Sequence, residues 1–173
     1  DLAVVHFSGH GALIDGKLYL LPAEVDARDA VGIKTAALSA DEVRGELLRL
    51  AQHGRVLVLL DACHSGATTM NGAALALDAT ALRQALAGAN VTVLTSSSGA
   101  EPSAERDTWG HGAFTQVLLQ ALGDPAADTR RNGLITTNDL AQYVAAHVAA
   151  LTDNQQHPGM EVRFGSTIFA SGQ

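Results

Sequence analysis

Cysteine is almost absent from this sequence, and its scarcity excludes two common uses of the residue. The single cysteine among 173 residues cannot form a disulfide within the chain or a zinc site built from several thiolates. It is therefore either a small buried hydrophobic residue or a free, reactive thiol. A free thiol suits a reducing compartment, and we expect a cytoplasmic protein.

Positive charge is also scarce. The chain has 11 Lys and Arg against 18 Asp and Glu, a formal net charge of −7, and its basic residues are dispersed. Without a basic stripe we expect neither nucleic acid nor a membrane surface as a partner. No apolar run approaches the roughly 20 residues of a membrane-spanning helix. We expect one globular domain over residues 1–173, large enough to need neither a metal nor a disulfide for stability.

Two stretches combine an apolar run with a polar, reactive ending. The stretch RVLVLLDACHSG begins at Arg55, and the run LAVVHF, which begins at Leu2, is followed by SGHG. Each apolar run has the length and composition of a strand buried on both faces. We expect these two strands to carry the thiol of Cys63 and the imidazole of His10 to one edge of a sheet.

The rest of the chain alternates between strand and helix signals. Asp15-Gly16 predicts a tight hairpin turn, Ser39 to Glu42 forms a capping box, and Asp78 is a further N-cap candidate. We predict strands at 3–8, 12–14, 17–20, 91–95 and 162–170, helices at 39–52, 78–88, 113–122 and 136–151, and loops at 22–34, 67–77 and 96–112. This alternation predicts an α/β sandwich with a mostly parallel central sheet.

Ligands of open α/β sheets bind at the carboxyl ends of the strands, where both polar clusters are expected. If the two strands are neighbours, His10 and Cys63 face each other, and the imidazole takes the thiol proton or holds the thiolate as an ion pair. Backbone N–H groups of Gly11 and Cys63 are then available to an oxyanion. This arrangement suits acyl transfer, above all amide hydrolysis, and needs no cofactor.

The paired motifs resemble those of the caspase-like cysteine peptidases, and specifically the metacaspase and orthocaspase branch in its bacterial form. The sequence has SGHG after one strand, DACHSG at the end of the next, and 53 positions between His10 and Cys63, close to the roughly 50 residues typical of caspases. The downstream segments SSSGAEPSAE, GAFTQVLLQAL, NGLITTNDLAQYV and QHPGM also resemble that family. The resemblance implies a caspase-like three-layer sandwich.

The resemblance further implies roles for individual residues. Cys63 is the nucleophile, His10 is the general base and acid, and Asp61 with Ser8 binds the substrate side chain before the scissile bond. Caspases have glutamine where this chain has Asp61, and a buried carboxylate pairs with a cation far better than with another carboxylate. We therefore expect protein or peptide substrates cleaved after Arg or Lys.

The family's domain has further strands and helices before its histidine strand, whereas this sequence opens on Asp1 almost directly before that strand. We therefore expect an upstream segment or a companion chain to complete the sheet. Some members bind calcium through acidic residues in the loop after the histidine. Glu24, Asp26 and Asp29 lie in the comparable loop, but the family's adjacent aspartates are not reproduced, so we do not favour a calcium site.

Caspase-type activation cuts the linker after the catalytic cysteine. No Lys or Arg occurs from His64 to Leu82, and Arg83 falls in a predicted helix, which leaves Arg106 as the accessible alternative. We expect activity without a cut in the loop at 67–77.

Other interpretations of these residues remain. A lone cysteine at a strand end is often structural. We interpret His64 as a neighbour of the site and Ser65, which lacks the G-x-S-x-G motif, as a turn residue. The remaining histidines are interpreted as core or surface residues without metal-binding spacing. Trp109 and the serines at 96–98 either shape the cleft or belong to a solvated loop. The alternative function is a catalytically silent caspase-like module that binds a protein partner in the same cleft.

Overall fold

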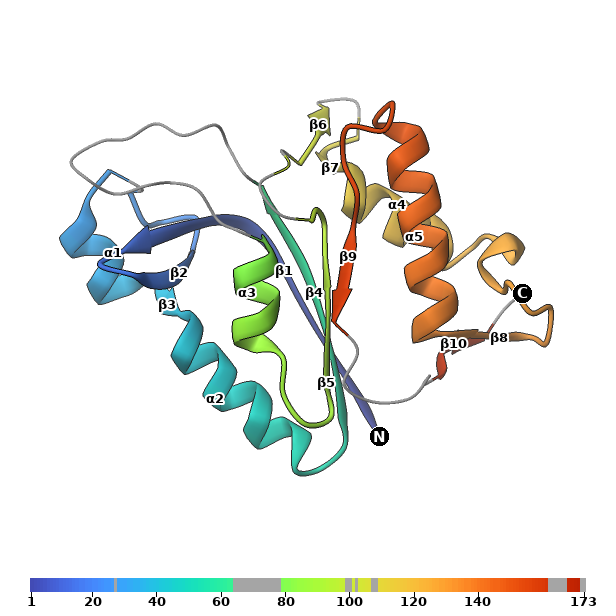
Figure 1. The fold of residues 1–173 in the computed structure, drawn as a ribbon, viewed down its shortest axis with the longest axis horizontal. Coiled ribbons are helices and arrows are strands. Elements are labelled where there is room, and N and C mark those ends of the chain that lie inside the picture. The colour runs from blue at the N-terminus through green and yellow to red at the C-terminus, as the bar shows by residue number, and fades with distance from the viewer. Residues whose placement is uncertain are drawn as a thin grey trace.

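The computed structural model describes residues 1–26, 28–63, 79–98, 101, 103–106, 109–161 and 168–171 (Figure 1). Its main feature is a six-stranded sheet in the order β3-β2-β1-β4-β5-β9. The centre of this sheet is parallel and consists of β1 (Leu2–Ile14), β4 (Arg55–Cys63) and β5 (Val91–Thr95). Antiparallel strands extend both sides: β2 (Lys17–Leu21) and β3 (Leu38–Ser39) beyond β1, and β9 (Gly159–Glu161) beyond β5.

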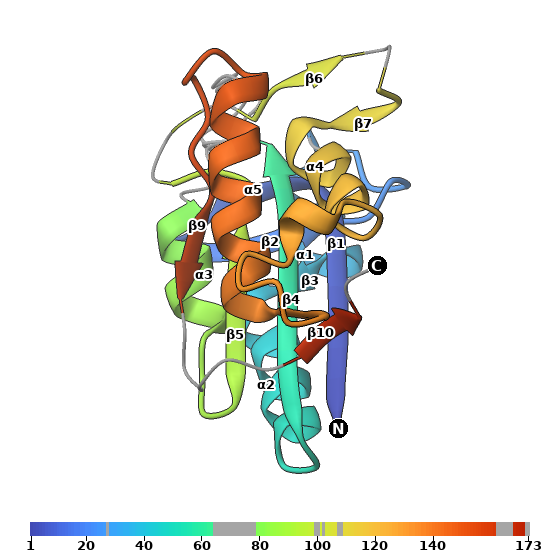
Figure 2. The same cartoon turned by 90° about the vertical axis from the view of Figure 1, so that its right-hand side faces the viewer.

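Helices cover both faces of this sheet. On one face, α2 (Ala40–Ala51) and α3 (Ala79–Leu86) bury Leu47 and Leu86 against Val58. On the other face, α4 (Ala113–Ala121) and α5 (Thr137–Leu151) contribute Phe114 and Val144 to a second core (Figure 2). The predicted α/β architecture, with three layers around a parallel sheet centre, is therefore confirmed.

Strand β4 belongs to both cores. Val56 and Val58 face α2 and α3, whereas Leu57 and Leu59 face α4 and α5. Alternate residues of a strand point to opposite faces, so a central strand covered on both sides needs apolar residues at every position. The uninterrupted run of valine and leucine before Asp61 meets this requirement.

Strand β1 differs from its prediction in two ways. It is one continuous strand, whereas the sequence predicted separate strands at 3–8 and 12–14. The strand is unbroken because it pairs in parallel with β4 as far as His10 and antiparallel with β2 from His10 onward. Its first half is also buried on one face only. Val4 is 47% exposed, because α4 and α5 lie over β4 and β5 and leave this part of β1 uncovered (Figure 2).

Three further segments differ from expectation. The stretch at 22–34 is not all loop, because Asp29 caps the short helix α1 (Ala30–Ala36) by accepting a hydrogen bond of 3.0 Å from the Val31 N–H. The stretch at 96–112 contains the two-residue strands β6 (Glu105–Arg106) and β7 (His111–Gly112). The sequence did not predict β9 or β8 (Leu134–Thr136), and β8 pairs with β10 (Ile168–Ser171). Of the predicted last strand at 162–170, residues 168–170 lie in β10, and residues 162–167 lie outside the described residues.

The capped helices and the hairpin agree with the sequence. Ser39 and Glu42 form the predicted capping box at the start of α2, and Asp15 and Gly16 adopt the positive φ angles of 50° and 74° that their hairpin turn requires. The predicted loop at 67–77 and the Asp78 cap lie outside the described residues. No helix in the described part of the chain is long and apolar enough to cross a membrane.

A buried carboxylate organises the start of α5. Asp139 accepts hydrogen bonds from the Thr136 N–H at 2.9 Å, from the Thr129 hydroxyl, and from Arg130 Nη2 at 2.8 Å. Burial alone raises the pKa of this carboxyl, but together these hydrogen bonds hold the pKa well below its ordinary value of 3.8. The ionised form of Asp139 therefore stabilises the folded chain.

We expect Asp139→Asn to lower the free energy of unfolding at pH 7 by about 2 kcal/mol, since hydrogen bonds to a charged group contribute roughly 1.5–3 kcal/mol. Because the folded-state pKa is depressed, the stabilisation is fully present above 3.8 and is lost as the pH falls below it, where the unfolded chain takes up the proton first. Urea unfolding should thus show a gap between wild type and variant that narrows in acid. The exposed Asp153, changed to Asn, is the control.

Candidate active site

The register of β1 and β4 places the predicted site residues side by side. His10 is the partner of Cys63, and Ser8 is the partner of Asp61, two positions earlier on each strand. Paired residues of parallel strands lie on the same side of a sheet, so His10 and Ser8 share the face that carries Asp61. The side chain of Cys63 and residues 64–78 are outside the described part of the chain, but the backbone register already brings positions 10 and 63 together.

His10 lies where β1 leaves one neighbour for another. Besides Cys63, it is the partner of Leu21 at the end of β2. Its side chain is exposed and borders a cavity of about 390 Å³ that we call the His10 cavity. The lining of the His10 cavity is Ser8, Gly9, His10, Leu21, Pro22, Ala23 and Val25. The next residue, Gly11, lies within the sheet opposite Leu20.

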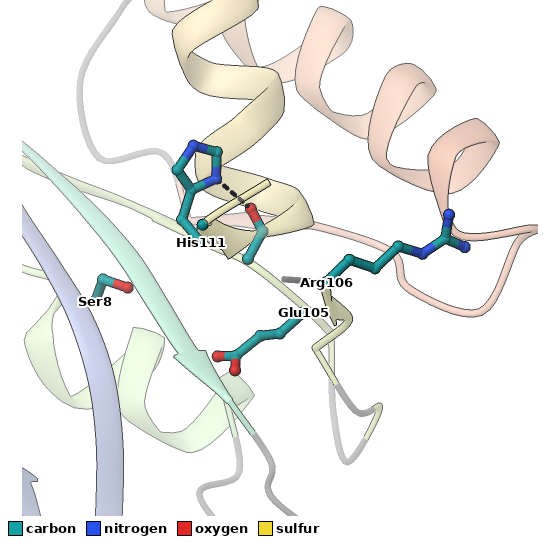
Figure 3. Close-up of a pocket in the computed structure, with 6 residues that line it drawn as sticks. Ser8, Glu105, Arg106 and His111 are labelled. Atoms are coloured by element: carbon teal, nitrogen blue, oxygen red, sulfur yellow. Dashed lines mark hydrogen bonds between the residues drawn. The ribbon is translucent and has the colours of Figure 1, made fainter. Parts of the chain in front are cut away.

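A second cavity, of about 480 Å³, also borders Ser8; we call it the Glu105 cavity. Its lining is Ser8, Glu105, Arg106, Gly110, His111 and Gly112. In Figure 3 the Glu105 carboxylate extends toward the side on which Ser8 lies, whereas Arg106 extends the opposite way. The Arg106 guanidinium lies 4.8 Å from the centre of the Trp109 ring. A carboxylate, rather than the neighbouring guanidinium, is thus the charge turned toward Ser8.

Asp61 lies behind the wall of the Glu105 cavity. It is 1% exposed, and its Oδ2 accepts hydrogen bonds from the Thr115 hydroxyl at 2.5 Å and the Thr115 N–H at 3.2 Å. Gly112 packs against this carboxylate so closely that a Cβ atom there would lie 2.8 Å from Asp61 Oδ2. The other oxygen, Oδ1, is buried without a hydrogen-bond partner. Burial raises the pKa of Asp61, the Thr115 hydrogen bonds oppose that rise, and the Glu105 carboxylate adds to it.

The segment that leads to Glu105 is held from a distant part of the chain. Gln156, which is fully buried, donates from Nε2 to the Ser96 carbonyl at 2.8 Å and accepts at Oε1 from the Ala104 N–H at 2.8 Å. The Ser96 and Ser103 hydroxyls lie 2.9 Å apart across the same loop. The two ends of the loop are therefore joined through one side chain, directly before Glu105.

Comparison with known families identifies the architecture that this geometry belongs to. A model of the caspase domain matches residues 1–167. The chain belongs to the caspase domain family. It is thereby assigned to the cysteine peptidases, in agreement with a sheet whose register pairs a histidine with the only cysteine of the sequence. A search of curated proteins found no match to the chain.

Four residues around this caspase-domain site were not predicted from the sequence. Glu105 lines the cavity beside Ser8, Thr115 and Gly112 fix Asp61, and Gln156 holds the loop. Glu105 and Gln156 occur in the segments SSSGAEPSAE and QHPGM, whose resemblance to the family was the only available signal. Gly112 and Thr115 occur in a third such segment, GAFTQVLLQAL, but nothing in that segment marks them as partners of a carboxylate more than 50 residues earlier in the chain.

Two of the three acidic residues considered for calcium have local partners. Asp26 pairs with Arg28, with Oδ1 2.9 Å from Nε, and Asp29 caps α1. Within the described ranges no group of three His, Cys, Asp or Glu side chains could hold a metal ion. The structure therefore gives no donor set from which to argue a metal-assisted step.

The remaining predicted residues fall as follows. Arg83 lies in α3, as the helix prediction requires, and Arg106 is exposed in β6. Ser96 and Ser97 are buried, so this end of the loop is packed rather than solvated. His64 and Ser65 lie outside the described residues.

We expect Gln156→Leu to destabilise the caspase domain by at least about 2 kcal/mol. Leucine removes both hydrogen bonds and leaves the Ser96 carbonyl and the Ala104 N–H without their partner, and each buried group left unsatisfied costs roughly 1–3 kcal/mol. The measurement is the free energy of unfolding in urea. Gln155→Leu is the matched control, because Gln155 is exposed and surface substitutions usually change stability by less than about 0.5 kcal/mol. Equal stabilities of the two variants would contradict the role given to Gln156.

Proposed function

We propose that this caspase domain is a cysteine endopeptidase of the metacaspase and orthocaspase branch, of bacterial type, that cleaves protein and peptide substrates after Arg or Lys. The observation that carries the proposal is the pairing of His10 with Cys63 across adjacent parallel strands. A nucleophile and its base must lie within reach of each other. The sequence contains no other cysteine.

In the proposed reaction, His10 accepts the proton of Cys63, and the thiolate attacks the scissile carbonyl carbon. The N–H groups of Gly11 and Cys63 stabilise the negative charge on the carbonyl oxygen of the tetrahedral intermediate. The carbon–nitrogen bond then breaks, and His10 gives its proton to the leaving amine. Water, deprotonated by His10, hydrolyses the resulting thioester and regenerates the thiol.

Specificity for a basic side chain is supported by the charges around the Glu105 cavity. Glu105 lines it, and Asp61 lies directly behind Gly112 with one oxygen unpartnered. The Glu105 carboxylate raises the pKa of Asp61, because like charges oppose ionisation, and a guanidinium or ammonium group relieves that repulsion. A substrate aspartate would add a third negative charge, whereas Ser8 offers a hydroxyl to a cationic side chain.

An upstream segment or companion chain remains part of the proposal. Along 2–9, β1 has β4 as its only sheet neighbour in the described part of the chain. Val4 is exposed, and a small, mainly apolar cavity of about 140 Å³ borders His6 and Leu59 on the same face. An open strand edge beside exposed apolar surface is suited to pairing with a further strand.

The function is tested with fluorogenic peptides that end in Arg, Lys or Asp. We expect turnover after Arg and Lys, complete loss in Cys63→Ala, and a loss of about 10²–10⁴-fold in His10→Ala, the range typical of a general base. His53→Ala is the control, because His53 is exposed in the turn before β4. Turnover after Asp would overturn the specificity, and the absence of any Cys63-dependent turnover would favour the silent scaffold.

The specificity should also depend on pH through Asp61. Because burial raises the pKa of this carboxyl above 3.8, it becomes neutral at a higher pH than an ordinary aspartate. We therefore expect KM for an arginine substrate to rise as the pH falls, before ordinary carboxylates titrate. Asp61→Asn should raise KM at neutral pH and remove this dependence, while the exposed Asp41→Asn leaves both unchanged. An identical pH profile of KM in wild type and Asp61→Asn would exclude Asp61 from the pocket.

A further inference from the structure

The His10 cavity has one apolar wall. Leu21, Pro22, Ala23 and Val25, from the end of β2 and the turn that follows, form this wall, whereas Ser8, Gly9 and His10 of β1 line the rest. Apart from His10, the described lining residues carry no ionisable side chain. Its chemistry is therefore unlike that of the Glu105 cavity.

The walls of the His10 cavity are anchored rather than loose. Leu21 is buried and is held by its pairing with His10. Val25 packs against a core cluster that includes Ile33, and its N–H donates to the Pro22 carbonyl at 3.1 Å. A preformed hollow of about 390 Å³ with one apolar wall is of the kind that binds side chains.

The position of Ser8 orders the two cavities along a bound peptide. Ser8 borders both, whereas His10 borders only the His10 cavity. A peptide that places its basic side chain in the Glu105 cavity and its scissile bond at His10 must continue into the His10 cavity.

The chemistry of the leaving group leads to the same assignment. When the carbon–nitrogen bond breaks, the proton on the His10 imidazole passes to the nitrogen of the residue that departs. That residue must therefore lie against His10 at that step. The cavity bordered by His10 is the space that its side chain enters.

We infer that the His10 cavity binds the side chain of the residue after the scissile bond and selects an apolar one. The inference rests on the proposed function and extends it to the leaving side of the substrate. A charged side chain would lose its hydration here without a charged partner among the described lining residues, which is unfavourable. An aliphatic side chain instead buries its surface against Leu21, Pro22 and Val25.

The test uses the acyl-enzyme. An N-acyl-arginine ester is supplied with an amino-acid amide at a pH where its amine is neutral. The amine nitrogen attacks the thioester carbon, Cys63 leaves as the thiol, and the product is the N-acyl-arginyl dipeptide amide. Water competes to give the free acid. The ratio of the two products reports binding on the leaving side alone and does not depend on the amount of active enzyme.

We expect leucine amide to capture the acyl group at least about tenfold more efficiently than aspartate amide or lysine amide, within the range typical of hydrophobic pockets. Ala23→Glu should abolish the preference for leucine amide over lysine amide, because it places a carboxylate in the cavity. Val31→Glu is the matched control: Val31 is 72% exposed in α1 and does not line the cavity. The control should keep the wild-type ratio.

The outcomes separate the two proposals. Cys63-dependent hydrolysis of the ester with equal capture by all three amides overturns the leaving-side site and leaves the peptidase intact. An unchanged product ratio in Ala23→Glu overturns it as well. Absence of Cys63-dependent hydrolysis overturns the proposed function, and the leaving-side site with it.

Discussion

The parallel pairing of β1 with β4 is the constraint on which the rest of the structure depends. It places His10 beside Cys63 and Ser8 beside Asp61. Because side chains alternate between faces, a slip of one residue would turn His10 and Ser8 to the opposite side of the sheet. The register is fixed from β4, which is buried by α2 and α3 on one face and by α4 and α5 on the other. The relative positions of His10 and Cys63 thus depend on the packing of the apolar residues at 56–60 of β4.

Strand β1 changes its sheet neighbour at His10, and two cavities border this part of the strand. Up to His10 the strand follows β4, and from His10 it follows β2, which carries Leu21 and the turn beyond it to the imidazole. The Glu105 cavity is lined from β6 and β7, the His10 cavity is lined from the end of β2 and the turn beyond it, and Ser8 borders both. The two cavities thus differ in their side chains, and in the proposed reaction a bound peptide would meet both.

Asp61 is a buried carboxylate whose surroundings oppose its ionised form. Its burial raises its pKa, and one of its oxygens has no hydrogen-bond partner, an arrangement that destabilises the ionised form. The absence of a side chain at Gly112 leaves space for the carboxylate, and Thr115 donates a hydrogen bond to it without neutralising its charge. Asp139 is the contrast: it is equally enclosed, but Thr129, Arg130 and Thr136 satisfy it and lower its pKa. Full pairing therefore favours the ionised form of Asp139, whereas partial pairing leaves burial to oppose the ionised form of Asp61.

The sequence by itself determined the features that depend on neighbouring residues. Apolar runs predicted the parallel strands, the Ser39 capping box predicted α2, and Asp15-Gly16 predicted the hairpin. The motifs around His10 and Cys63 indicated the family. Only the tertiary structure decided that β1 continues through SGHG, that Glu105 faces the side of Ser8, that Thr115 holds Asp61, and that Gln156 joins Ser96 to Ala104. These contacts join residues far apart in the chain, and Gln156 lies 52 and 60 positions from its two partners. Local propensity carries no information about such pairs, because they exist only once the sheet and its helices have packed.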